Sequence, residues 1–242
     1  MSNISKYILI FFLITFLINL EILISNEKIN QIKYYKEKFK VKCASEKITD
    51  NFGNGYEALY GTRNMRTVLY GICYRGGANN FYHKTNKRDN QNPLPDDAIK
   101  NLSNNGFSAA IYLYSKNYQY ATKFYYNPSR KDTFYYYNNT LSNRKQIKEL
   151  MYKIKNVIDN PKLGPIYIHC WNGWHQSGYA SALILVQFCN ITNQEAVKYW
   201  EKNTDGITKG YDHIKTKILE FIKFDDIIIS DNLKKEICPC LE

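Results

Sequence analysis

The segment from His169 to Gly178, which reads HCWNGWHQSG, places a cysteine between a short apolar strand and an apolar helix. We expect the strand at Pro165 to His169 and the helix at Tyr179 to Phe188. Backbone N–H groups at a helix N-terminus bind anions, because the helix dipole places partial positive charge there. The same position favours the thiolate form of a cysteine, which is its nucleophilic form. The pattern therefore predicts that Cys170 is a nucleophile facing a bound phosphate group.

This segment resembles the signature loop of the protein tyrosine and dual-specificity phosphatases, written H-C-x5-R-S/T-G and commonly with glycine third after the cysteine. Tyr74 to Gly77 (YRGG) is also similar to the first-strand motif of the small dual-specificity-like members, and the resemblance covers roughly residues 67–222. The loop positions that match in register are His169, Cys170, Gly173, Ser177 and Gly178.

The resemblance implies roles for these residues. Cys170 would attack phosphorus and form a phosphocysteine, His169 would support it, and Ser177 would ease release of the phosphate from sulfur. The chemistry uses no cofactor. The ligand would be a phosphorylated small molecule or a phosphoprotein. The other loop residues are expected to bind the phosphate, namely Trp171, Asn172, Gly173, Trp174, His175 and Gln176.

Gln176 departs from the family pattern, because it stands where the signature has arginine. Glutamine is neutral and offers one amide, whereas arginine offers a charged planar fork of donors. Losing two hydrogen bonds to a charged group, each worth roughly 1.5 to 3 kcal/mol, lowers rate or affinity by a factor on the order of a hundred to ten thousand. Candidate compensators are His175, if protonated, and Arg75, if its strand end lies beside the loop.

The missing arginine leaves three hypotheses open. The first is a weakened or altered phosphoric monoester hydrolase. The second is a catalytically inactive pseudophosphatase that binds a phosphorylated or otherwise anionic ligand. The third is thiol-redox chemistry, through Cys170 or through the Cys238 and Cys240 pair.

The general acid is also unassigned. The family places an aspartate on a loop after a strand and before a helix, and here residues 138–142 occupy that place without an acidic side chain. Asp132 precedes the strand, and Asp205 lies downstream of the loop. We therefore carry both as candidates, together with the alternative that there is no conventional acid.

The two loop tryptophans, Trp171 and Trp174, have two interpretations. They form an aromatic rim for a ring-bearing substrate, or they pack under the loop. We expect no metal site, because a tight loop cannot aim His169, Cys170 and His175 at one ion and no fourth ligand is apparent.

Periodic apolar patterns around the loop predict an α/β domain with a partly parallel central sheet flanked by helices. A long polar loop is expected from Asn79 to Asn92. The predicted strands are Thr67 to Tyr74, Phe107 to Tyr114, Thr133 to Tyr137 and Pro165 to His169, and the predicted helices include residues 95–102, 143–159 and 179–188, one that begins at the Thr192 and Glu195 capping box, and one around 214–222.

The chain begins with an uncharged apolar run from Tyr7 to Leu20. Residues 1–25 are expected to be a cleaved signal peptide or an uncleaved signal anchor, and the alternative is a buried N-terminal helix. Either of the first two places the domain outside the cytoplasm, in a periplasmic, secreted or lumenal location, or anchored to a membrane by that segment alone. Residues 26–55 would be a lead-in or stalk, 56–223 the phosphatase-like domain, and 224–242 a tail containing Cys-Pro-Cys.

The net charge of +11 would attract phosphates, nucleic acid or anionic membranes. The basic residues are scattered and no nucleic-acid-binding motif is present, so we do not expect nucleic-acid binding.

An oxidising compartment would allow disulfides among the six cysteines. We expect Cys170 and Cys189 to be free, the latter inside an apolar helix. The other four, Cys43, Cys73, Cys238 and Cys240, would then pair in one of three connectivities.

Overall fold

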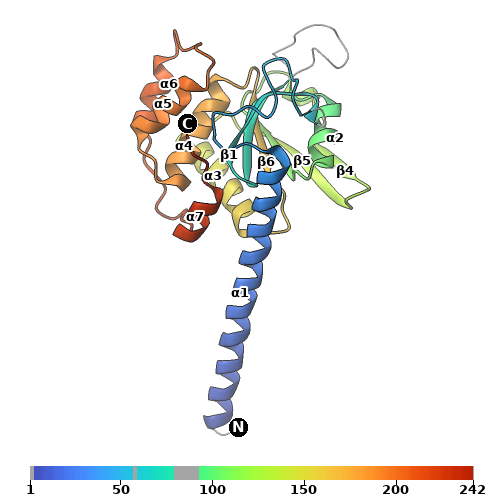
Figure 1. Cartoon of the computed structure of the whole chain (residues 1–242), viewed down its shortest axis with the longest axis vertical. Coiled ribbons are helices and arrows are strands. Elements are labelled where there is room, and N and C mark those ends of the chain that lie inside the picture. The colour runs from blue at the N-terminus through green and yellow to red at the C-terminus, as the bar shows by residue number, and fades with distance from the viewer. Residues whose placement is uncertain (1–2, 57–58, 79–92, 242) are drawn as a thin grey trace.

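The computed structural model describes residues 3–56, 59–78 and 93–241 (Figure 1). The polar loop expected from Asn79 to Asn92 lies outside the described residues. One six-stranded sheet, in the order β1-β2-β6-β3-β5-β4, forms the centre of the fold. Its strands are β1 (Thr62–Leu69), β2 (Cys73–Ala78), β3 (Ala109–Tyr112), β4 (Phe124–Asn127), β5 (Asp132–Asn138) and β6 (Ile166–Cys170).

The four inner strands β2, β6, β3 and β5 run parallel, and the edge strands β1 and β4 are antiparallel to their neighbours. This arrangement confirms the predicted α/β fold with a partly parallel sheet. The helices are α1 (Asn3–Phe39), α2 (Asp96–Asn104), α3 (Arg144–Asp159), α4 (His175–Cys189), α5 (Asn193–Lys202), α6 (Asp212–Leu219) and α7 (Asp231–Ile237).

The register brings the carboxyl ends of the inner strands to one edge of the sheet. His169 on β6 is level with Gly76 on β2 and with Tyr112 on β3, and Tyr112 is level with Asn138 on β5. In parallel sheets, ligands bind outside this edge. The loop that follows Cys170 begins there.

The helix that follows this loop is the most deeply buried one. Every residue of α4 from Ser177 to Phe188 is buried, which agrees with its apolar sequence. The capping box predicted for α5 is present, since Thr192 Oγ1 accepts from the Glu195 N–H and Glu195 Oε2 accepts from the Thr192 N–H. Asn143 caps α3 in a similar way, through the N–H of Gln146. The capping box of α5 and the helix over residues 143–159 were predicted from sequence, whereas the Asn143 cap was not.

The predicted single strand from Thr67 to Tyr74 is wrong. The chain turns at Gly71, which has a φ of +66°, and the two sides pair as the β1–β2 hairpin. Glycine adopts this left-handed conformation without steric cost. The apolar run therefore contains the end of one strand and the start of another.

The first part of the segment that we expected to be a lead-in or stalk, residues 26–39, is helical. Helix α1 continues to Phe39, and its last turns contact the domain (Figure 1). Ile32, Tyr35 and Phe39 are buried, and the rings of Tyr35 and Phe39 pack against Tyr74 and Phe107. Their spacing of three and four residues places them on one helical face. In the part of the chain that the structure describes, no helix is both long enough and apolar enough to cross a membrane.

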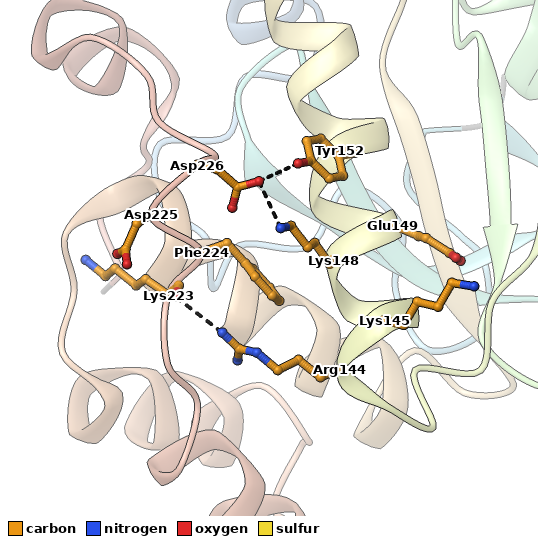
Figure 2. Close-up of a pocket in the computed structure, with 9 residues that line it drawn as sticks. All are labelled: Arg144, Lys145, Lys148, Glu149, Tyr152, Lys223, Phe224, Asp225 and Asp226. Carbon is orange, nitrogen blue, oxygen red and sulfur yellow. Dashed lines mark hydrogen bonds and ion pairs between the residues drawn. The ribbon is translucent and has the colours of Figure 1, made fainter.

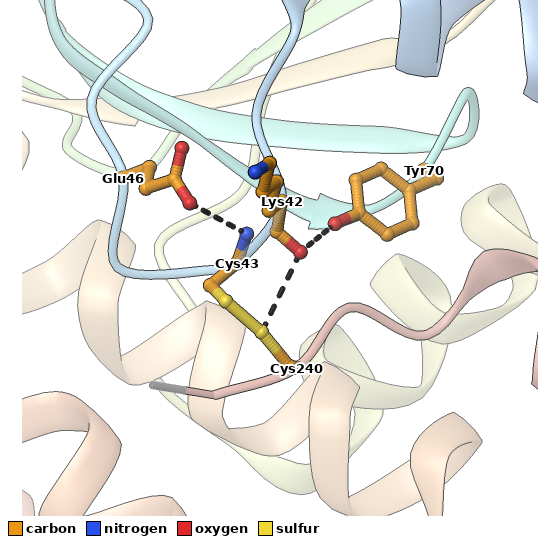
Figure 3. The surroundings of a disulfide bond; sticks show 5 residues. All are labelled: Lys42, Cys43, Glu46, Tyr70 and Cys240. Carbon is orange, nitrogen blue, oxygen red and sulfur yellow. Dashed lines mark hydrogen bonds between the residues drawn. A yellow bond between two sulfur atoms is a disulfide. The ribbon is translucent and has the colours of Figure 1, made fainter.

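Two disulfides attach the C-terminal segment to the domain. Cys43 pairs with Cys240 (Figure 3), and Cys189 pairs with Cys238. The expected pairing is therefore wrong for two cysteines, because Cys73 is free and Cys189 is bonded, whereas Cys170 is free as expected. Cys73 lies fully buried at the start of β2, while Cys189 is the last residue of α4 and is bonded to the tail at Cys238. Two disulfides are typical of an oxidising compartment.

Mass spectrometry of the denatured, unreduced chain tests this pairing. Alkylation should label two thiols, Cys73 and Cys170, and digestion should yield linked peptides for the two disulfides, since a disulfide blocks both sulfurs. Reduction before alkylation is the control and should expose all six. A linked peptide that contains Cys73 would contradict the structure.

Candidate active site

Cys170 ends β6, residues 171–174 form a loop, and α4 begins at His175. This is the strand, loop and helix that the sequence predicts. The Cys170 side chain is 3% exposed, and its Sγ lies 3.3 Å from Oγ of Ser177 in the first turn of α4. The N–H groups of a first helical turn have no partner within the helix. The thiol and the free amide groups of the helix therefore meet at one place.

The loop lies directly against the end of β2. Gly77 forms an isolated bridge with Asn172, and a Cβ atom on Gly77 would lie 2.5 Å from the carbonyl oxygen of Trp171. On the loop side, Gly173 has a φ of +77°, and its Cβ would lie 2.7 Å from the backbone of Gly76. Side chains at these positions would push the two segments apart. The last glycine of the YRGG motif, Gly77, and the loop glycine, Gly173, are therefore both needed for the close approach of β2 and the loop.

Side chains from β1 and β2 donate hydrogen bonds to the backbone carbonyls of the loop. The guanidinium of Arg75 is fully buried, and its Nη1 donates to the carbonyl of Gly173 at 2.6 Å. Its Nη2 donates to the carbonyl of Asn203 at 3.0 Å. Asn64 donates from Nδ2 to the carbonyl of Asn172 at 2.8 Å. Arg75, which we carried as a candidate phosphate ligand, is thus placed against the loop backbone.

His169 is fully buried and neutral. Its ring stacks on Tyr112 with 4.9 Å between centroids, its Nδ1 donates to the carbonyl of Cys170 at 3.1 Å, and its Nε2 accepts from the hydroxyl of Tyr136 at 2.8 Å. Burial lowers the pKa of His169 to about 3, against a partly offsetting effect of the hydrogen bond to Cys170. His169 therefore supports the loop backbone as an uncharged donor.

The two tryptophans of the loop occupy different environments. Trp171 is half-buried, donates from Nε1 to the hydroxyl of Tyr112 at 2.9 Å, and packs on the ring of Tyr114 at 4.8 Å. Trp174 is buried and donates from Nε1 to Oδ2 of Asp205 at 3.1 Å. Burial, and then the neighbouring Cys170, raise the pKa of Tyr114. Trp171 and Tyr114 thus form an aromatic wall beside the cysteine, whereas Trp174 packs under the loop.

His175 contacts the segment that precedes α6 (Asp212–Leu219). Its ring stacks on Tyr211 at 3.5 Å, and its Nε2 donates to the carbonyl of Ile207 at 2.6 Å. Burial lowers the pKa of His175 below its usual value, which disfavours the protonated form that could replace the arginine charge.

Gln176 contacts the loop that precedes α3. Its Nε2 donates to the carbonyl of Thr140 at 3.1 Å. Residues 138–142, where the family pattern has an acid, are therefore connected to the cysteine loop by a neutral amide. This contact could not be predicted from the sequence, because Thr140 belongs to no motif.

The structure does not bring Asp132 to the site. Asp132 begins β5, at the opposite end of the strand from Asn138, and it forms an exposed ion pair with Arg130 at 2.7 Å. Asp205 lies nearer, beside Trp174, but it is occupied by ion pairs with Arg66 at 3.0 Å and Lys47 at 2.7 Å.

Asp205 is also poorly suited to donate a proton. Burial alone would raise its pKa, but the hydrogen bond from Lys47 and the charges of Arg66 and Lys47 hold the pKa of this carboxyl below its usual range. An acid catalyst needs a proton at neutral pH.

A groove of about 650 Å³ lies between α3 and residues 223–226 (Figure 2). Lys148 pairs there with Asp226 at 2.8 Å, Tyr152 donates to the same carboxylate, and Arg144 lies over the ring of Phe224. We assign no part of the candidate site to this groove.

The steric requirement at Gly77 can be tested with oxyanion binding. Gly77→Ala should displace the loop and abolish binding of tungstate, measured by calorimetry, because the added Cβ meets the backbone of Trp171 and Asn172. Gly210→Ala is the control, since Gly210 has open space around it and a positive φ, so only a backbone cost of about 1–2 kcal/mol is expected. Equal tungstate affinity in the two variants would contradict the requirement.

The neutral state of His169 predicts an acid-labile fold. Between pH 6.5 and about 3 the unfolded chain binds a proton at His169 and the folded chain does not. Stability should therefore fall with decreasing pH in this window by up to about 1.4 kcal/mol per pH unit from this residue. Urea unfolding at pH 4 to 7 should show a shallower slope for His169→Asn than for the wild type. The exposed His213→Asn is the control, and a wild-type slope in His169→Asn would contradict the assignment.

No protein-family model matches the chain, and no curated protein matches it. Among solved structures it is similar to the core catalytic domain of the PP-IP phosphatase SIW14 from S. cerevisiae in complex with citrate, at 15% identity over 73% of this chain and 92% of that chain, with a TM-score of 0.44. It is also similar to Tk-PTP in the active form, at 14% identity over 66% and 98% with a TM-score of 0.43, and to P. aeruginosa TpbA, at 10% identity over 63% and 91% with a TM-score of 0.36. In the sequence of its loop and in its α/β fold, the chain resembles the cysteine-dependent phosphatases, with Gln176 in the place of their arginine.

Proposed function

We propose that the chain is a cysteine-dependent phosphoric monoester hydrolase with Cys170 as its nucleophile. The observation that carries this proposal is the position of the Cys170 thiol. It lies at the junction of β6 and α4, free of any disulfide, with the Ser177 hydroxyl 3.3 Å away. A helix N-terminus stabilises both a thiolate and a bound phosphate.

In the first step, Sγ of Cys170 attacks phosphorus, an S–P bond forms, and the P–O bond to the leaving alcohol breaks. The leaving oxygen takes a proton from water, because Asp132 is remote and Asp205 is held ionised. In the second step, water attacks the phosphocysteine and releases phosphate and the thiolate. The hydroxyl of Ser177 stabilises the departing sulfur by a hydrogen bond.

This arrangement supports hydrolysis of esters whose leaving groups need little acid assistance. General acid catalysis contributes typically a hundredfold to ten-thousandfold. A phenolate leaves without a proton more readily than an alkoxide does. We therefore propose aryl phosphates as the better substrates, with the half-buried Trp171 and Tyr114 as the surface against which a ring packs.

A second candidate is a pseudophosphatase that binds a phosphorylated ligand without turnover. One observation favours it: Gln176 donates to the carbonyl of Thr140, so the residue in the arginine position is engaged with the neighbouring loop. A binding module needs the amide groups of the loop and does not need an acid.

We further propose that the domain works outside the cytoplasm on a phosphorylated small molecule or a phosphoprotein. Two disulfides support an oxidising compartment, and the net charge of +11 supports an anionic ligand. Nucleic acid is not part of the proposal.

An assay with p-nitrophenyl phosphate separates the two candidates. The hydrolase proposal predicts slow turnover by the wild type and none by Cys170→Ser, because the serine hydroxyl is a much weaker nucleophile than the cysteine thiolate. Gln176→Arg should raise kcat/KM by a factor on the order of a hundred or more, since it adds charge and a second donor. Gln176→Lys is the matched control and should gain less, because it adds charge without the fork.

The alternative outcomes are equally informative. An inert wild type together with an active Gln176→Arg would identify a pseudophosphatase that lost one residue. Turnover that persists in Cys170→Ser would rule out Cys170 as the nucleophile.

A further inference from the structure

The carbonyl groups of the cysteine loop are held from the side of β2. Nη1 of Arg75 lies 2.6 Å from the carbonyl oxygen of Gly173 and 3.4 Å from that of Trp174. In a planar trans peptide, the C=O of one residue and the N–H of the next point in opposite directions. The N–H groups of Trp174 and His175 are therefore directed away from Arg75.

We propose that Arg75 is a positioning residue for oxyanion binding, which fixes these two peptide groups so that their N–H groups face the anion. The inference rests on the proposed function and deepens it. In the phosphatase signature, the loop arginine binds the oxyanion directly. Here Arg75, on the β2 side of the loop, orients the backbone N–H groups that bind it. Arg75 does not touch the ligand and acts through the loop backbone.

The placement of Arg75 in the sheet makes this contact rigid. Arg75 is paired with Ile168 in the parallel β2–β6 ladder, two residues before Cys170. Its second nitrogen, Nη2, donates to the carbonyl of Asn203 after α5, and the guanidinium lies 5.8 Å from the ring of Tyr199. The planar fork thus joins the loop to α5 and cannot rotate without breaking both bonds. A lysine at this position could satisfy only one of them at a time.

The charge of Arg75 supports the same role. Among the described residues, no carboxylate contacts Arg75, whose partners are three backbone carbonyls and one ring. The nearby Arg66 is matched by Asp205, at 3.0 Å. A buried guanidinium keeps its proton, and a buried charge without a counterion is costly. An anion bound on the other face of the loop offsets that cost.

Neighbouring charges show that the region behind the loop is electropositive. Burial, followed by the charge of Arg75, lowers the pKa of Arg66 to about 10. The hydroxyl of Tyr167 is influenced by both Cys170 and Arg75, which act in opposite directions on its pKa, although burial dominates and raises it. Arg75 also reaches the loop directly, since its Nη1 donates to the carbonyl of Gly173, three residues after Cys170.

Tungstate binding to the full-length, disulfide-bonded chain tests the proposal, because this probe does not require turnover. Arg75→Met removes the charge and both donors and should weaken tungstate binding on the order of a hundredfold, whereas Arg75→Lys keeps the charge and should weaken it by roughly tenfold. The affinities are measured by calorimetry at a temperature at which circular dichroism shows each variant to be folded.

Lys28→Met is the matched control for the loss of a buried cation. Lys28 is 2% exposed and donates to the carbonyl of Leu163, which precedes β6 at the end of the sheet opposite to Cys170. Lys28→Met should lower the melting temperature and leave the tungstate affinity within about twofold, because the bond from Lys28 to Leu163 lies at the other end of β6 and does not orient the loop.

The outcomes separate this inference from the proposed hydrolysis. Wild-type affinity in a folded Arg75→Met, or an equal loss in Lys28→Met, would overturn the inference and leave the hydrolase proposal standing. A wild-type chain that hydrolyses no aryl phosphate but binds tungstate, with weaker binding in Arg75→Met, would overturn the hydrolase proposal and support the inference. If Arg75→Met does not fold, Arg75→Lys decides: weaker binding supports the positioning role and unchanged binding overturns it.

Discussion

The close contact between the end of β2 and the loop after β6 positions the other groups of the site. Two backbones can approach this closely only where neither carries a side chain, and Gly77 and Gly173 meet that condition. The contact aligns Arg75 with the carbonyl of Gly173 and leaves Cys170 at the start of α4. The conformation of the loop after Cys170 thus depends on its contact with β2 as well as on the loop's own sequence.

The electrostatics of the site are those of an anion binder more than of an acid–base catalyst. Positive charge is buried behind the loop on Arg75, while His169 is neutral because it is buried among aromatic rings. The nearest candidate acid, Asp205, is held in its ionised form by Arg66 and Lys47. The site therefore has groups that favour oxyanion binding, and its candidate acid is ionised. The hydrolase and pseudophosphatase hypotheses both require the bound anion and differ only in turnover.

Two disulfides connect the C-terminal tail to the helix that follows the loop and to the segment after α1. The Cys189–Cys238 disulfide joins the C-terminal end of α4 to the tail, and the Cys43–Cys240 disulfide joins the same tail to the segment after α1 (Figure 3). A crosslink lowers the conformational entropy of the unfolded chain, and the gain is larger for longer loops. The loop, α4 and both terminal segments therefore form one connected unit.

The strand, loop and helix around Cys170, the capping box of α5 and the lack of the signature arginine could be predicted from the sequence, because each depends on residues that are neighbours in the chain. The fold was needed to show which cysteines pair, that Arg66 and Lys47 form ion pairs with Asp205, and that Arg75 donates to the carbonyl of Gly173. The contact of Gln176 with Thr140 is of the same kind, since 36 residues separate them. Hydrophobic period and capping act within a few residues, whereas disulfides, ion pairs and side-chain hydrogen bonds depend on distances that exist only once the sheet has aligned its strands.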